Sequence, residues 1–443
     1  MIQNQNERVF LNKIKAYIYN MEKIILNNYR CFEHIELSFK EEVNLLIGDN
    51  SSGKTTLIRA FSSVLNSFFI GFSDENTRFF GLAQNDFSIK ESLTGLANEP
   101  QIKIDFKYLD VQASLELNSK KGRTLTTPLK PINRMGKELY NGLFQEGRQI
   151  KSLPLFASFS TADIHTNRKI NGDKFKRYEH KPSFGYYECL QGDGFLEYWT
   201  KRLLILKEAQ KGDIEIEGVR LAVQKSLGSE GCNVISDIQI RHNQGKVYYI
   251  LSDNREVETD NLSDGLRRLV NIVLDLSFRC MILNRGIYGL EACQNTTGTV
   301  LIDEIDLHLH PTLQSVVVKG LRNAFPKLQF IITSHAPMVM TEIPINNKNK
   351  IYRLAYSKKD GYSAQEIQTY GLDASTIIDT VLGVVPRAKD VDNRLVVLFT
   401  LIDLEKYEEA FEMLRNMRNE FGDNLPELTK AEAMLNFLTN DDD

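Results

Sequence analysis

The residues best suited to chemistry form a complete G-x-x-x-x-G-K-[ST] pattern. It runs from Gly48 through Gly53 and Lys54 to Thr55, within the stretch VNLLIGDNSSGKTT. In such a loop the glycines let backbone N–H groups turn toward phosphates, the lysine adds a positive charge at the β/γ oxygens, and the threonine can bind magnesium. An apolar run precedes the loop and helical apolar spacing follows it, so we expect a nucleotide rather than a glycine turn without a ligand.

Two carboxylates follow a second apolar run. The run Thr299–Ile302 predicts a buried parallel strand, and Asp303 and Glu304 come directly after it. We expect Asp303 to hold magnesium and Glu304 to orient or deprotonate an attacking water. Alone, the pair could equally be a helix cap or a solvated strand end, but beside the phosphate loop it favours nucleotide hydrolysis.

Two further elements complete the pattern. The run Leu328–Thr333 predicts another buried strand, and His335 follows it where a neutral imidazole can sense the γ-phosphate. The sequence Leu262-Ser263-Asp264-Gly265 opens an apolar-periodic helix, with Ser263 at the expected N-cap. Each element alone is commonly structural, so their significance depends on their order along the chain.

A phosphate loop, a Ser-x-Gly helix start, an Asp-Glu strand and a His strand is the order found in ABC-type ATPases, and the chain resembles their SMC, RecF and OLD group. Tyr29, Arg30 and Phe32 are similar to the N-Y/F-R-x-F element of that group, and IDEIDLHLHPTLQ and TSHAPMV to its later motifs. The resemblance implies ATP and Mg²⁺ as ligands and a head-to-tail homo-oligomer, in which Ser263 and Gly265 of one protomer reach the γ-phosphate held by Lys54 of another.

The nucleotide-binding residues that the resemblance carries over all match its motifs. They are Gly48, Asn50, Gly53, Lys54, Thr55, Thr56, Ser263, Gly265, Asp303, Glu304 and His335. The signature reads LSDG where the group has LSGG, and Gln84 is a candidate for the coupling glutamine by position only. His308 and His310 form an H-x-H, but we see no third ligand and expect no dedicated metal site there.

The resemblance implies an α/β fold, an ABC-type P-loop ATPase head with a mixed N-terminal sheet and a parallel core sheet. It carries a short helical insertion and a C-terminal helical hairpin. The expected parts are an N-terminal extension (1–20), an ATPase core (21–118 and 263–370), an insertion or lid (119–262) and an acidic helical region (371–443). The insertion is too short for long coiled-coil arms, and periodicity at 195–210 and 217–227 predicts a helical arm.

Charge is unevenly distributed along a chain whose formal net charge is −4. Residues 119–181 have 14 basic and 5 acidic side chains, whereas residues 371–443 have 7 basic and 16 acidic ones. The basic segment indicates either a DNA contact or a solvated face. The acidic end favours docking to a protein, or a hairpin that only caps the core. The basic side chains cluster at Lys120, Lys121, Arg123, Arg168, Lys169, Lys174, Lys176 and Arg177.

Composition excludes a membrane protein, because no stretch approaches the roughly 18 apolar residues of a span. The five scattered cysteines and the absence of a signal peptide predict a reducing cytoplasm. No Toprim nuclease pattern follows His335, so we expect no nuclease activity of the chain itself. The segment Thr369–Arg387 and the run KRYEHKPSFGYYECL resemble PtuA, the ATPase subunit of Septu anti-phage systems. That resemblance implies regulation of a separate HNH nuclease subunit similar to PtuB; the alternative is a RecF- or SMC-like DNA-maintenance ATPase without a nuclease partner.

Overall fold

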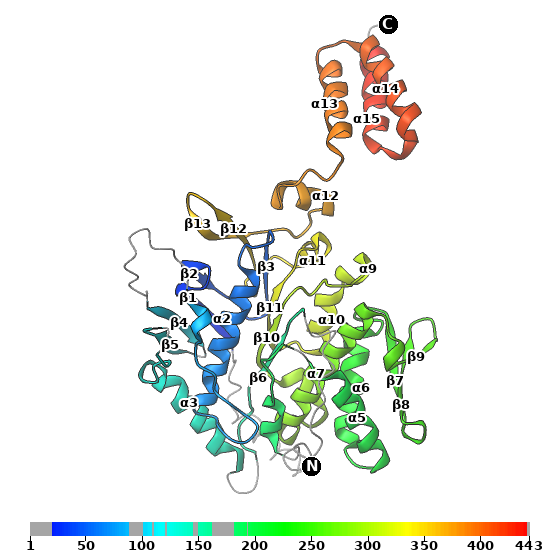
Figure 1. The fold of residues 1–443 in the computed structure, drawn as a ribbon. Coiled ribbons are helices and arrows are strands. Elements are labelled where there is room, and N and C mark those ends of the chain that lie inside the picture. The colour runs from blue at the N-terminus through cyan, green and yellow to red at the C-terminus, as the bar shows by residue number, and fades with distance from the viewer. Residues whose placement is uncertain are drawn as a thin grey trace, which may run out of the picture. The chain divides into compact units, whose positions relative to one another are not determined.

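The chain divides into two compact units, one up to Leu372 and one from Asp373 onward. The structure, a computed structural model, describes residues 20–87, 101–108, 110–119, 122–144, 149–161, 181–192 and 194–440. Figure 1 shows the second unit in orange and red. None of the described helices is both long and apolar enough to cross a membrane. The clusters at 120–121 and 168–177 of the predicted basic segment lie outside the described residues.

Six strands form the core sheet of the first unit. Their order is β13 (Gly361–Ile367), β12 (Asn349–Ser357), β3 (Val43–Gly48), β11 (Leu328–Thr333), β10 (Gly298–Ile302) and β6 (Leu155–Phe159). All neighbours are parallel except β13, which is antiparallel at the edge. Every residue of β3, β10 and β11 is buried, as their apolar runs predict. The carboxyl ends of these three strands therefore meet at one edge of the sheet.

A second sheet has four strands in the order β2 (Phe32–Ser38), β1 (Met21–Tyr29), β4 (Ile102–Tyr108) and β5 (Val111–Leu117). Every neighbouring pair is antiparallel, whereas the sequence predicts a mixed sheet. Two of these pairs have a local reason, because the two-residue links after β1 and β4 are too short for a parallel crossover to β2 and β5. The α/β fold class, with an N-terminal sheet, a core sheet and C-terminal helices, is confirmed.

The helix that follows the phosphate loop, α2 (Lys54–Asn66), contacts both sheets. It touches β4 of the antiparallel sheet and β3, β10 and β11 of the core sheet. Its buried side chains include Leu57, Phe61 and Val64, at the spacing the sequence predicts. The phosphate loop is thus fixed on one side by β3 and on the other by a helix held between two sheets.

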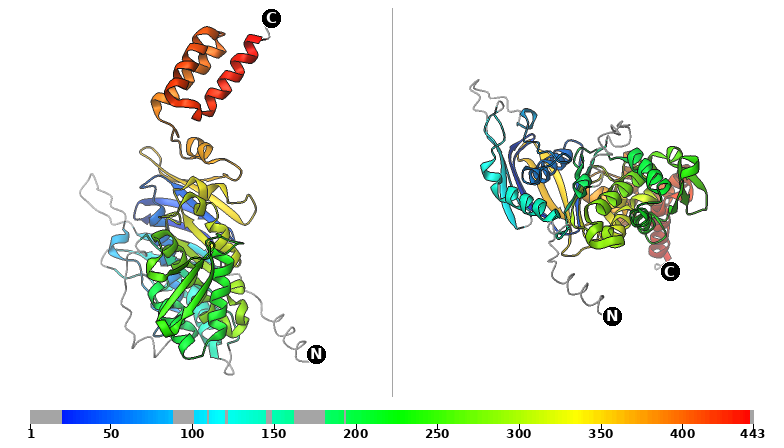
Figure 2. Two further views of the ribbon diagram at one scale, coloured as in Figure 1. Left: turned by 90° about the vertical axis from the view of Figure 1, so that its right-hand side faces the viewer. Right: turned by 90° about the horizontal axis from the view of Figure 1, so that it is seen from below.

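The helical arm predicted from periodicity consists of α5 (Leu196–Glu208) and α6 (Asp213–Leu227), and Gly212 between them has a left-handed φ of 76°. Both helices pack on the 25-residue α7 (Asp264–Tyr288). The Trp199 ring stacks on Phe278 at 4.7 Å, and its Nε1 donates to Asp275 at 2.7 Å. The arm is therefore joined to the helix that starts at the Ser263-x-Gly265 motif (Figure 2).

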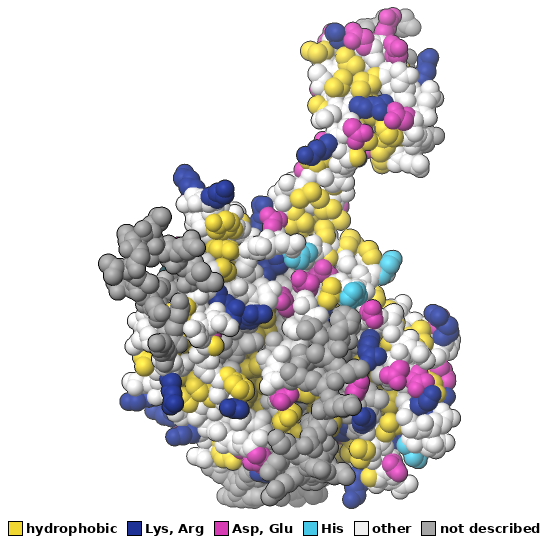
Figure 3. Space-filling model, viewed as in Figure 1, with side chains coloured by type: hydrophobic (Ala, Val, Ile, Leu, Met, Phe, Trp, Pro, Cys, Tyr) yellow, Lys and Arg dark blue, Asp and Glu magenta, His cyan; other side chains and the backbone are white. Residues whose placement is uncertain are grey.

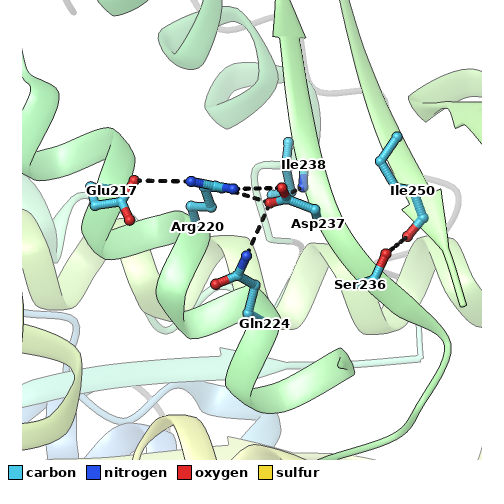
Figure 4. Close-up of polar contacts among 7 residues, drawn as sticks. All are labelled: Glu217, Arg220, Gln224, Ser236, Asp237, Ile238 and Ile250. Atoms are coloured by element: carbon cyan, nitrogen blue, oxygen red, sulfur yellow. Dashed lines mark hydrogen bonds and ion pairs between the residues drawn. The ribbon is translucent and has the colours of Figure 1, made fainter. Parts of the chain in front are cut away.

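A three-stranded sheet extends from the arm: β7 (Ile235–Arg241), β8 (Lys246–Leu251) and β9 (Glu256–Glu258). Figure 4 shows its link to α6, where Arg220 donates to both carboxylate oxygens of Asp237 at 2.7 Å each. This hydrogen-bonded pairing lowers the pKa of Asp237. The other α-helices in the described part of the first unit are α3 (Lys130–Asn141), α8 (Ala292–Asn295), α9 (Pro311–Gln314), α10 (Val317–Ala324) and α11 (Pro337–Thr341).

The second unit is a bundle of α13 (Lys389–Asp403), α14 (Tyr407–Phe421) and α15 (Pro426–Asn440), preceded by the short α12 (Ala374–Thr376). The predicted hairpin corresponds to α14 and α15, and α13 adds a third helix. Its apolar residues Leu395, Leu398 and Ile402 complete the core, at helical spacing within an almost continuous apolar run. The domain boundaries expected from the sequence stay a prediction. Strand β6 of the core sheet lies within 119–262, the segment expected to be an insertion or lid.

Candidate functional site

The phosphate loop connects the end of β3 to the start of α2. Gly48 has a φ of 147° and Gly53 a φ of 95°. A Cβ at Gly48 would lie 2.2 Å from the carbonyl oxygen of Leu354, and one at Gly53 would lie 2.5 Å from the Phe32 ring. Both positions therefore require glycine, and Phe32 of the Tyr29–Arg30–Phe32 element supports the loop directly.

Lys54 lies inside the loop rather than in solvent. Only 6% of its surface is exposed, and its Nζ donates to the carbonyl oxygens of Gly48 at 2.8 Å and Asp49 at 2.9 Å. Burial lowers the pKa of Lys54, while the negative charges of Asp303 and Glu304 act in the opposite direction. The ammonium is thus held against the backbone of the phosphate loop. Of the other predicted loop residues, Asn50 is exposed, and Thr56 in the first turn of α2 is half-buried.

Asp303 connects this loop to the next strands. Its Oδ2 accepts a hydrogen bond from Thr55 Oγ1 at 2.9 Å, and its Oδ1 accepts one from Thr333 Oγ1 at 2.6 Å. The carboxylate is therefore fixed in orientation beside the hydroxyl of the phosphate loop. A carboxylate oxygen and a hydroxyl at this spacing are hard oxygen ligands, which suit Mg²⁺ together with phosphate oxygens and water.

Glu304 and His335 lie at the same edge of the sheet, after the neighbouring strands β10 and β11. Glu304 has a left-handed φ of 51°, and its backbone N–H donates to Thr333 Oγ1 at 2.7 Å. Both side chains are partly exposed. The left-handed residue turns the chain out of the strand direction directly after Asp303. The structure thus brings together the phosphate loop, the two carboxylates and the histidine.

Arg268, which the sequence reasoning did not single out, holds this carboxylate turn from the other side. Its guanidinium, 1% exposed, donates to the carbonyl oxygens of Asp303 and Glu304 at 2.6 Å each. Arg268 lies on α7, three residues after Gly265, on a side that also buries Ile272. A basic residue at such a buried helical position was the signal available in the sequence.

The start of α7 contacts the loop after Glu304. Ser263 is exposed at the N-cap position but makes no side-chain capping bond. A Cβ at Gly265 would lie 2.4 Å from the carbonyl oxygen of His308, so this position also requires glycine. Gly265 therefore packs against the loop after the carboxylates of the same chain, and Ser263 is left at the surface.

The other candidates from the sequence, Gln84 and His310, lie in a short turn and at the start of a short helix. Gln84 is exposed in a short 3-10 turn, and Asp86 at the end of that turn pairs with Arg30 at 2.6 Å. His310 Nδ1 accepts from the backbone N–H of Thr312 and so caps α9. Within the described ranges, no group of three or more His, Cys, Asp or Glu residues could hold a metal ion.

A hollow of about 890 Å³ opens beside the phosphate loop. Arg30, Cys31 and Thr56 line it from the first unit's N-terminal half, and Tyr356 and Tyr362 line it from the β12–β13 hairpin. The Tyr362 ring meets the Phe32 ring edge-on at 5.2 Å. Thr56, which follows Thr55 on α2, is the residue of the phosphate-loop stretch that lines this space.

Residues 43–341 match the family described as "AAA domain, putative AbiEii toxin, Type IV TA system". Because this segment is more than half of the chain, the chain belongs to that family, which is one of ATPases.

Over 413 aligned residues the chain is 25% identical to the retron Vc95 probable ATPase of Vibrio cholerae serotype O1 biovar El Tor, covering 80% of this chain and 78% of that protein. The Septu protein PtuA of Bacillus mycoides (strain KBAB4) is 39% identical over 85 residues, which are 19% of this chain and 11% of that protein. A solved structure of the recombination mediator RecF aligns with 77% of this chain and 97% of its own, at 13% identity and a TM-score of 0.39. The predicted resemblance to PtuA and to RecF-like ATPases is confirmed by sequence.

The contacts of Arg268 lead to a prediction. Replacing Arg268 with Met removes the donors from one buried and one partly buried carbonyl, so we expect the free energy of unfolding to fall by about 2–4 kcal/mol. We also expect ATP turnover to fall at least about tenfold while the ATP dissociation constant stays within about threefold, because Arg268 positions Glu304 and does not line the phosphate loop. Thermal unfolding, equilibrium ATP binding and phosphate release measure the three quantities.

The neighbouring Arg267→Met variant is the matched control. The guanidinium of Arg267 lies 4.0 Å from the carboxylate of Asp260, so the substitution removes only a long ion pair. Arg268→Lys separates charge from geometry, because a lysine cannot donate to two carbonyls in parallel as a guanidinium does. Unchanged turnover in both Arg268 variants, measured well below their unfolding temperatures, would mean that Arg268 only stabilises the fold.

Proposed function

We propose that the chain is the ATP-binding and ATP-hydrolysing subunit of an anti-phage defence complex, and that nucleotide-dependent assembly controls an HNH nuclease partner. One observation supports the ATPase part most strongly: the Thr55 hydroxyl, the Asp303 carboxylate and the buried Lys54 ammonium meet at one edge of the core sheet. The defence context rests on the names of the relatives, a retron ATPase and a Septu PtuA.

In this proposal each residue has one role. The backbone of Gly48–Thr56 and the Lys54 ammonium bind the phosphates, and the adjoining hollow receives the nucleoside. Thr55 and Asp303 would hold Mg²⁺, which would neutralise charge on the phosphates. Glu304 accepts a proton from the attacking water, and His335 contacts the γ-phosphate. Asn50, in the exposed part of the loop, faces the nucleotide.

The proposed assembly uses Ser263 and Gly265. Ser263 is exposed, and Gly265 packs on the loop that follows the catalytic carboxylates. We propose that two chains meet head to tail across ATP, so that Ser263 and Gly265 of one complete the phosphate site of the other. Arg268 then links two nucleotide sites. It lies on α7, whose start meets the ATP of the other chain, and it holds the carbonyls of Asp303 and Glu304, which act on the ATP of its own chain.

The nuclease partner is tested by purifying the tagged protein from its native host with and without ATP, followed by mass spectrometry. The proposal expects a small HNH protein in stoichiometric amounts, in a complex whose size changes with ATP. DNA recovered without any nuclease would contradict the defence assignment and favour a RecF- or SMC-like ATPase. The basic segment 119–181 motivates that second candidate, because its net positive charge suits a phosphate backbone.

A DNA contact through that segment makes a separate prediction. Neutralising Lys174, Lys176 and Arg177 together should weaken DNA binding and reduce the slope of log affinity against log salt by up to about three, since each lost phosphate contact reduces counterion release. Titrations of a labelled duplex at several salt concentrations measure both. As a control, Lys406, Arg415 and Lys430 of the acidic unit are neutralised instead; equal losses in both triple variants would exclude the basic segment as the contact.

A further inference from the structure

The hairpin of β12 and β13 extends past the core sheet beside the phosphate loop. Strand β12 pairs with β3 until Leu354 lies opposite Gly48, the residue at which β3 ends. Beyond that point, among the described strands, β12 pairs with β13 alone. The turn of the hairpin is closed, because the backbone N–H of Asp360 donates to Ser357 Oγ at 2.9 Å. The end of the hairpin, 355–363, is therefore an ordered structure that begins where the phosphate loop begins.

Aromatic side chains connect this end of the hairpin to the phosphate loop. Tyr356 on β12 and Tyr362 on β13 are partners in the strand register, and their ring centroids lie 4.7 Å apart. Tyr362 also meets the Phe32 ring edge-on, and a Cβ at Gly53 would lie 2.5 Å from that ring. Strand β13 contacts β2, which begins at Phe32 (Figure 1). Tyr356 is thus linked to the phosphate loop through two packed rings.

Tyr356 is the member of this group that the core does not use. It is 58% exposed, and within the described part of the chain its ring meets no aromatic ring other than that of Tyr362. Both tyrosines line the hollow of about 890 Å³, and so does Thr56 of the phosphate-loop stretch. An exposed aromatic ring that is held by a second ring offers a preformed surface on which a nucleobase can stack.

The charges of the hollow do not favour a second phosphate group. Its charged lining residues are of both signs: Arg30, Lys358, Lys359, Glu33 and Asp360. Arg30 is moreover paired with Asp86 at 2.6 Å. Figure 3 shows Lys or Arg side chains at the end of the hairpin, with hydrophobic side chains beside them. With charges of both signs and two aromatic rings, the hollow suits a neutral planar group better than an anion.

We propose that the base of the bound nucleotide stacks on Tyr356 at the wall of this hollow, and that Tyr362 holds the Tyr356 ring in position. This inference rests on the proposed binding of the ATP phosphates by the loop. Thr56 connects the two sites, because it follows Thr55 and lines the hollow. Every base has a π-face, so Tyr356 contributes affinity for the nucleoside without selecting adenine.

The first experiment measures equilibrium binding of ATP and of inorganic tripolyphosphate to the full-length chain. Tyr356→Ala should weaken ATP binding about tenfold, and Tyr356→Phe, which keeps the ring, should stay within about twofold of the wild type. Neither substitution should change the binding of tripolyphosphate, which has no base. Tyr370→Ala is the matched control, because Tyr370 is 53% exposed and does not line the hollow, so this variant should bind ATP normally.

The outcomes separate the stacking role from the proposed function. Wild-type ATP affinity in Tyr356→Ala would overturn the stacking role. Equal losses of ATP and tripolyphosphate affinity would also overturn it, because the hairpin would then only support the phosphate loop. If the wild-type chain binds tripolyphosphate as tightly as ATP, the stacking role alone fails. If it binds neither ligand, the proposed function fails and the stacking role fails with it.

The second experiment uses Cys31, which lines the hollow and is the only one of the five cysteines that is not buried. Burial raises the pKa of the Cys31 thiol, so iodoacetamide is applied at alkaline pH, where the reactive thiolate forms. At matched occupancy, ATP should slow the alkylation of Cys31 at least about fivefold and tripolyphosphate less than about twofold, because access to the thiol controls its rate. Mass spectrometry of the Cys31 peptide measures both rates. Equal protection by the two ligands would overturn the proposal.

Discussion

The Lys54→Ala protein is expected to bind ATP at least about 100-fold more weakly than the wild type. Lys54 provides the side-chain cation inside the phosphate loop, and its Nζ is already held at the carbonyl oxygens of Gly48 and Asp49. Each hydrogen bond between a charged donor and a phosphate oxygen contributes about 1.5–3 kcal/mol, so the loss of two costs at least the stated factor. Equilibrium binding of a fluorescent ATP analogue measures the change.

Loss of binding must be separated from loss of fold. Trp199 is the only tryptophan and stacks on Phe278 away from the loop, so its fluorescence reports unfolding of the arm and α7. We expect an unchanged unfolding midpoint by this signal. Lys319→Ala, a change of the same type at an exposed position on α10, should bind ATP normally. Wild-type affinity in Lys54→Ala would remove the nucleotide assignment for this loop.

Elements whose partners lie nearby in sequence, or whose apolar runs have a single interpretation, were predictable. The runs at 43–48, 298–302 and 328–333 are buried on both faces, and this property alone predicts central parallel strands. The arm helices were equally visible from their periodicity. By contrast, α13 has apolar residues on both its buried and its exposed sides, so no amphipathic stripe marks it. The run Leu155–Phe159 gave no sign that it would pair with β10, 143 residues away in register.

The candidate site was predictable where linear motifs determine it. Gly48, Lys54 and Thr55 belong to one short motif, and the strand ends predicted that Asp303 and His335 lie at the same edge. The structure adds residues that act across the fold: Thr333 orients Asp303 and the Glu304 backbone, and Arg268 holds the carbonyls of both. Such contacts depend on how α7 and β11 pack on β10. The sequence can mark Arg268 as a basic residue at a buried helical position, but it does not show which carbonyls Arg268 reaches.

The Glu304→Gln protein should bind ATP but hydrolyse it at least about 100-fold more slowly, since general base catalysis contributes about 10²–10⁴-fold. Glutamine has nearly the same shape, and the contacts that fix this residue involve its backbone: its N–H donates to Thr333 and its carbonyl accepts from Arg268. The substitution therefore removes the proton acceptor and leaves the turn in place. Single-turnover phosphate release and equilibrium ATP binding separate the two effects.

Slow hydrolysis should also change assembly. If ATP joins two chains head to tail, Glu304→Gln should accumulate the larger species in the presence of ATP, and Lys54→Ala should not form it. Size-exclusion chromatography with light scattering distinguishes these outcomes, and Glu342→Gln, an exposed position beyond α11, serves as the charge-matched control. Turnover at the wild-type rate in Glu304→Gln would exclude Glu304 as the base. Slow turnover without the larger species would retain that role and reject the head-to-tail sandwich, because hydrolysis and assembly depend on different residues around the same nucleotide.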